Sequence, residues 1–86
     1  MTNEQVYRVT ELVERKKREI FEALSKRYPD LIYLMQKDLT GAKRFFWDNF
    51  EGLAVSLGFQ DPEEIGYFAK LFTDAMIGYL QGNPNP

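Results

Sequence analysis

The large apolar residues in the second half of this chain recur at the spacing of an α-helix. Nine of the thirteen aromatic residues fall between Phe45 and Tyr79. At about 100° per residue, a helix over residues 62–81 would gather one apolar half-circle from Ile65, Phe68, Ala69, Leu71, Phe72, Ala75, Met76, Tyr79 and Leu80. A helix over residues 40–57 would gather Ala42, Phe45, Phe46, Phe50, Leu53 and Leu57. Arcs this wide indicate either two central helices of a four-helix core or helices that expose part of the arc as a binding surface.

The first half of the chain contains start and stop signals for two helices. Thr2 and Gln5 have the spacing of a capping box, which predicts a long helix that begins at the N-terminus and runs to about Arg27. Pro29 stops this helix, because the residue before a proline disfavours helical backbone. Pro29 then opens a short second helix that ends near Asp38.

The second half contains signals for two more helices. Thr40 is the candidate N-cap of the third helix, and Gly58 is placed to close it with a left-handed C-terminal cap. Asp61 and Pro62 then start the fourth helix, which Gly82 ends. Interior glycines lower helix propensity by about 1 kcal/mol each, which suggests that other helices approach closely at Gly52, Gly66 and Gly78.

These signals predict an all-α protein, a compact four-helix bundle with a long first helix and a short second helix. Eighty-six residues provide for one hydrophobic core. We therefore expect a single helical domain over residues 1–82, followed by a disordered tail over residues 83–86.

The composition argues against enzymatic chemistry. The chain has no His and no Cys, so it lacks the commonest general base, the thiol nucleophile and the usual zinc ligands. Its paired acids, Glu63 with Glu64 and Asp48 with Glu51, fit helix-start and solvent-facing positions better than the two sides of a cleft. We expect no catalytic residue, cofactor or metal ion.

The sequence also argues against a membrane location. It has no run of about 18 apolar residues that could span a bilayer. Its N-terminus lacks the basic and apolar regions of a secretory signal, so a cytoplasmic location is expected.

Charge is distributed unevenly along the chain. Residues 1–44 carry ten Lys and Arg against seven acids, whereas residues 45–86 carry one Lys against six acids. Four consecutive basic residues lie in the middle of the first helix: Arg15, Lys16, Lys17 and Arg18. Most of these charges fit solvated helix faces, but this run is a candidate for orienting a charged partner.

The first helix has an interrupted apolar stripe. Its valines are Val6, Val9 and Val13, and the stripe resumes at Ile20 and Leu24 after two lysines. An unpaired lysine is costly to bury, so the stripe is interpreted as two separate packing regions. The valines are then predicted to meet a second copy of the chain in a homodimer.

Two aromatic residues are predicted to face a partner. Trp47 and Tyr67 lie toward the edges of the apolar arcs, and exposed aromatic side chains are enriched at interfaces. With the basic run as orienting charges, the sequence favours a non-enzymatic protein-interaction or regulatory module that self-associates and binds a protein of unknown identity.

The alternative is a small nucleic-acid-binding protein. The basic part of the first helix could neutralise phosphates, or a helix-turn-helix near residues 30–50 could present Lys43 and Arg44. The acidic pI near 5.1 argues against both, and Asp48 and Glu51 would face the phosphates.

Overall fold

The computed structural model describes residues 1–82 as an all-helical bundle, as the sequence predicts. The tail expected at residues 83–86 lies outside the described residues. The four helices are α1 (Asn3–Arg27), α2 (Pro29–Lys37), α3 (Leu39–Ser56) and α4 (Pro62–Leu80). The first has 25 residues and the second has 9, which confirms a long first helix and a short second one.

Most of the helix ends follow the sequence signals. The Thr2 hydroxyl accepts a hydrogen bond from the Gln5 N–H at 3.2 Å, and the Gln5 side chain accepts one from the Thr2 N–H at 2.8 Å. This reciprocal pair is the predicted capping box. Gly58 has φ +97°, the left-handed conformation that ends α3. One assignment was wrong: Asp38, not Thr40, caps α3, since its carboxylate accepts from the Gly41 N–H at 3.0 Å.

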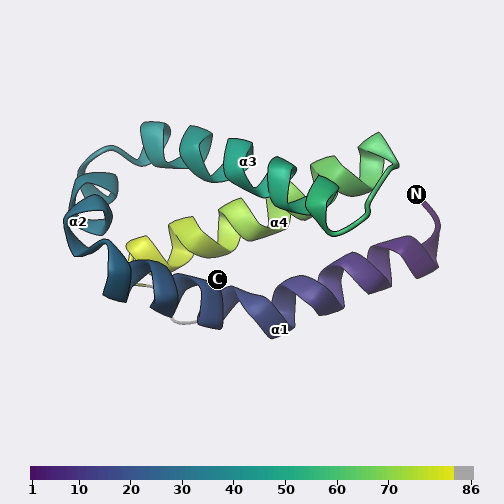
Figure 1. The fold of residues 1–86 in the computed structure, drawn as a ribbon, viewed down its shortest axis with the longest axis horizontal. Coiled ribbons are helices and arrows are strands. Elements are labelled where there is room, and N and C mark those ends of the chain that lie inside the picture. Colours follow the sequence, from purple (N-terminus) through teal and green to yellow (C-terminus); the bar gives the residue numbers. More distant parts are fainter. Residues whose placement is uncertain (83–86) are drawn as a thin grey trace.

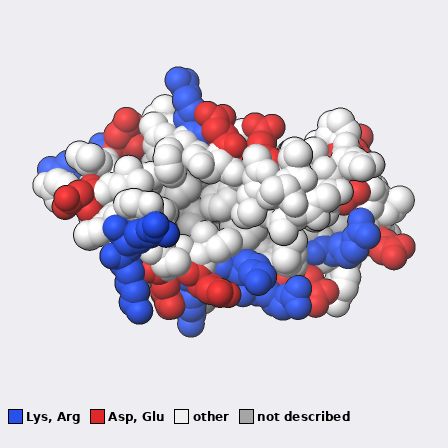
Figure 2. Space-filling view, in the orientation of Figure 1, with Lys and Arg blue, Asp and Glu red and all other residues white. Residues whose placement is uncertain are grey.

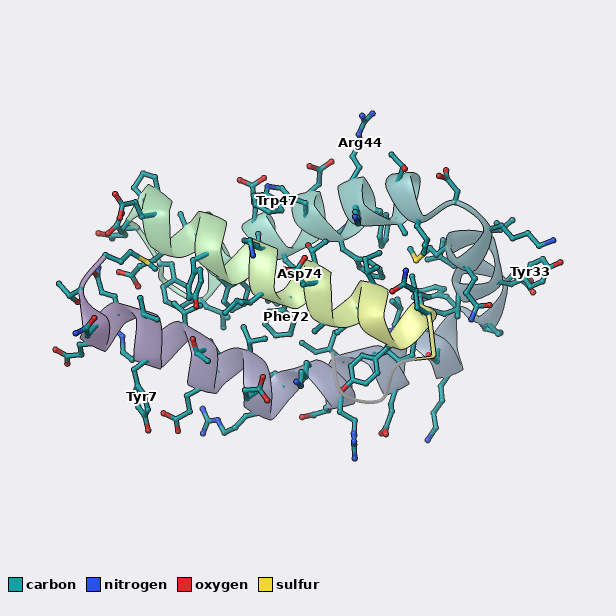
Figure 3. All side chains as sticks on the ribbon, turned by 180° about the vertical axis from the view of Figure 1, so that it is seen from behind. Tyr7, Tyr33, Arg44, Trp47, Phe72 and Asp74 are labelled. Atoms are coloured by element: carbon teal, nitrogen blue, oxygen red, sulfur yellow. The ribbon has the colours of Figure 1, made fainter. Side chains whose placement is uncertain are left out.

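Helix α4 lies at the centre of the bundle. It packs against each of the other three helices, whereas no Cα of residues 3–27 lies within 8 Å of a Cα of residues 39–56. Figure 1 shows α1 and α3 along two edges of the molecule, with α4 passing behind the space between them and α2 at one end. In the view from behind, α4 is in front (Figure 3). The wide apolar arc of α4 is therefore explained by three neighbours.

The core is built on the α3–α4 contact. Phe46, Phe50, Phe68 and Phe72 are all buried, as their central positions in the two arcs predict. The ring centroids of Phe50 and Phe72 are 4.7 Å apart, and those of Phe68 and Phe72 are 4.8 Å apart. Offset aromatic contacts of this kind add to the free energy of apolar burial.

Helix α1 contradicts the predicted dimer contact. Val9 and Val13 are both buried inside the chain, in the same core cluster as Phe68 and Phe72, and Val6 is half-buried. Val9 and Val13 therefore cannot meet a second copy without opening the fold. The prediction failed because the lysines do not interrupt the stripe. The Lys17 side chain is only 15% exposed, but its Nζ pairs with Glu14 Oε1 at 3.0 Å.

Two of the three interior glycines do not mark close helix contacts, whereas the third, Gly78, is buried in α4. A Cβ added to Gly52 or to Gly66 would have no atom within 4 Å. The packing reason proposed for these two glycines is therefore wrong. None of the helices described over residues 1–82 combines the length and the apolarity needed to cross a bilayer.

Candidate protein-binding groove

A groove runs between α1 and α3, and α4 forms its floor. It consists of three adjoining cavities of about 410, 260 and 370 Å³. The first two share Leu12 and Leu57, and the second and third share Ile20, so they form one continuous depression. We call this depression the groove. It opens because α1 and α3 both pack on α4 but not on each other.

The groove is lined mainly by apolar side chains. Phe68 and Phe72 of α4 line its middle section, together with Leu12 and Ile20 of α1, Leu53 of α3 and Leu57, the C-cap of α3. Its edges expose large apolar side chains, since Leu57 is 55% exposed and Phe45 is 39% exposed. Figure 2 shows uncharged side chains around a recess in the middle of this face. A monomeric protein rarely exposes a continuous apolar surface without a binding role.

The basic run does not form one surface. Successive helix residues are turned by about 100°, so four consecutive side chains point in different directions. Arg15 and Lys16 line the groove. Lys17 lines a cavity between α1 and α4 with Leu71 and Asp74, and Arg18 is exposed. Only the first two of the four predicted orienting charges are therefore placed beside the groove.

The two predicted aromatic anchors lie in different environments. Trp47 is 37% exposed and lies on α3 near Arg44, outside the groove lining (Figure 3). Tyr67 is half-buried against the core, and its hydroxyl lies 3.5 Å from that of Thr10. The expectation that Tyr67 is an exposed anchor was wrong, because α1 covers this side of α4. The structure does not bring Trp47, Tyr67 and the basic run together into one binding surface.

The acids at the start of α4 have structural contacts. Glu64 is 7% exposed and accepts hydrogen bonds from Gln5 Nε2 at 2.7 Å and Arg8 Nη2 at 3.3 Å. The expectation that Glu64 faces solvent was therefore wrong. Glu63 accepts a hydrogen bond from the Met1 ammonium group at 2.7 Å, and this contact raises the pKa of that group. Both carboxylates attach the start of α1 to the start of α4.

The region of the predicted helix-turn-helix differs from a DNA-binding helix-turn-helix motif. Helices α2 and α3 are separated by Asp38 alone, a shorter connection than the usual three or four residues. Lys43 and Arg44 are exposed on α3, but Asp48 of the same helix is exposed as well. Within residues 1–82, no group of three or more acidic, His or Cys side chains is placed to hold a metal ion.

Comparisons with protein-family models, curated proteins and solved structures gave no match. Function is therefore inferred from the groove itself. The sequence pattern contained part of the signal, since Phe45 and Leu57 belong to an apolar arc too wide for one neighbour. It contained no sign that α1 and α3 stay apart, because this depends on how both helices dock on α4.

Proposed function

We propose that this chain is a non-enzymatic protein-interaction module that binds a partner helix in the groove. The observation that carries the proposal is the continuous apolar depression between α1 and α3, with Leu57 and Phe45 exposed at its edge. An amphipathic helix laid in such a groove buries its apolar face against the two walls and the floor. The partner helix would lie between α1 and α3, where no helix of this chain lies.

Exposed apolar residues of α3 provide a matched pair of variants for testing this proposal. Leu57 lines the groove, whereas Val55 is 60% exposed and is not part of the groove lining. Leu57→Asp places a charge in the groove, and Val55→Asp places the same charge elsewhere on α3. Because neither side chain is buried, both variants are expected to keep wild-type helicity and thermal stability within about 1 kcal/mol.

Affinity capture from the cells that make the protein measures the effect. Proteins captured by the wild-type chain should be retained by Val55→Asp and lost by Leu57→Asp, because a charge in an apolar interface is costly to desolvate. Equal capture by both variants, with both folded, would contradict the proposal. A second copy of the chain is one partner that this groove could take, and light scattering at tens of micromolar distinguishes a dimer from the 10.1 kDa monomer.

A further inference from the structure

We infer that the partner helix is acidic, and that it extends along the groove to its α2 end. This inference rests on the proposed function, because it assigns a chemistry to the occupant of the same groove. It is carried by the basic side chains around α2 and by the apolar cavities at the same end of the groove.

The α2 end has an excess of basic side chains that are not neutralised. Residues 26–44 contain five of them against Asp30 and Asp38: Lys26, Arg27, Lys37, Lys43 and Arg44. All five are exposed. Within residues 1–82, the ion pairs closer than 4.0 Å involve none of the five. Five basic against two acidic side chains leave residues 26–44 with a formal net charge of +3. Asp38 keeps its negative charge while it accepts from the Gly41 N–H, and it lines the cavity beside Leu34.

Two of these basic side chains are held over aromatic rings. The Arg27 guanidinium lies 5.7 Å from the centroid of the Tyr28 ring, and Lys37 Nζ lies 4.9 Å from that of Tyr33. Such cation–π contacts restrict the side chains without removing their charge. In Figure 2, Lys and Arg side chains appear together with some Asp and Glu side chains around the end of the molecule where Figure 1 draws α2.

Apolar cavities lie beside the Arg27–Tyr28 contact, because Tyr28 lines the 370 Å³ section of the groove. The 370 Å³ section of the groove ends here, and it shares Leu31 and Phe45 with a cavity of about 260 Å³ that Leu34 also lines. Leu34 is 61% exposed, so the apolar surface continues from the groove onto α2. The partner therefore needs apolar side chains to fill the cavities and acidic side chains to meet the basic residues. An acidic amphipathic helix provides both from one element.

Other anionic partners fit this surface less well. A nucleic acid would neutralise the basic side chains but leave Leu34 and the cavities unfilled. A membrane surface is flat relative to a groove of this kind and does not need its depth. A second copy that paired its own α2 end with this one would bring basic side chains together.

The test uses two synthetic helical peptides of the same length. Both carry leucines on one face, and one carries glutamates on its flanks where the other carries lysines. Fluorescence anisotropy at about 0.15 M salt should show the glutamate peptide binding at least about tenfold more tightly than the lysine peptide. Raising the salt concentration should reduce this difference.

Two pairs of variants locate the binding surface. Arg27→Glu with Lys37→Glu, the two side chains held over aromatic rings, should weaken binding of the glutamate peptide by about tenfold. The control, Arg18→Glu with Lys70→Glu, changes the net charge equally at exposed sites elsewhere and should change binding less than about twofold. Leu34→Ser should weaken binding, whereas Val55→Ser, at a similarly exposed site, should not.

Several results would overturn the inference. They are failure of the glutamate peptide to bind, equal binding of both peptides, and equal losses in the two double variants. Duplex DNA or anionic vesicles that bind independently of Leu34→Ser, or a dimer that Leu34→Ser dissociates, would assign the surface to another occupant. If the peptides fail while Leu57→Asp still abolishes partner capture, the groove remains a docking site and only the acidic partner is excluded.

Discussion

The α3–α4 contact and the α1–α3 space use similar side chains with opposite results. Between α3 and α4, the rings of Phe50 and Phe72 stack with their centroids 4.7 Å apart, and both side chains are buried. Between α1 and α3, leucines, an isoleucine and phenylalanines line a depression, and Leu57 stays more than half exposed. Apolar spacing along a helix therefore shows which residues avoid water, but not which neighbour covers them. The apolar residues that no helix of the chain covers form the surface at which we propose that a partner binds.

The largest expected effect is in the covered region. Phe72→Ala removes a ring that is 1% exposed and stacked on Phe50, and we expect it to lower the free energy of unfolding by about 3–5 kcal/mol. Leu57→Ala removes a comparable apolar group from the groove edge and should cost less than about 1 kcal/mol. Chemical denaturation of both variants measures the difference. Similar losses would mean that the two regions do not differ as described.

The next largest loss of stability is expected for a charge introduced into the buried side of α1. Val9→Glu buries a carboxylate that has no partner, which should cost several kcal/mol and leave much of the protein unfolded. Val6→Glu, at a half-buried position one turn earlier, should be tolerated better. Circular dichroism and light scattering follow the two variants. A folded Val9→Glu monomer obtained from a wild-type dimer would restore the dimer contact first predicted from the sequence.

These valines show what the sequence could and could not predict. The helix number, most boundaries and the four central phenylalanines follow from spacing and capping residues, which act locally. The burial of Val9 and Val13 was missed because Lys17 can lie along the apolar surface and still pair with Glu14. The groove was missed for a different reason, since it depends on the separation of two helices that are far apart in the sequence.

A stabilising substitution tests the side of α3 that is exposed outside the groove. Gly52 lies inside α3, and a Cβ there would meet no atom within 4 Å. Gly52→Ala should therefore raise the free energy of unfolding by about 0.5–1 kcal/mol through higher helix propensity. Thermal unfolding measures the gain. A loss of stability would show that another group closely approaches this side of α3.

The smallest effect concerns pH. Glu63 raises the pKa of the Met1 ammonium group above its ordinary value of 8.0. The stabilisation from this contact is thus fully present below about pH 8 and is lost as pH rises through the raised value. Thermal unfolding between about pH 7 and pH 9 should show a slight decline that Glu63→Gln removes. An identical decline in that variant would assign the effect to other groups.

The central claim is that the groove, and not the outer side of α3, is the binding face. It is tested most directly by nuclear magnetic resonance of the labelled chain during titration with a captured partner. The account predicts shift changes at Leu12, Leu53 and Leu57, with little change at Trp47 and Val55. Changes centred on Trp47 and Val55, with the groove leucines unaffected, would contradict it.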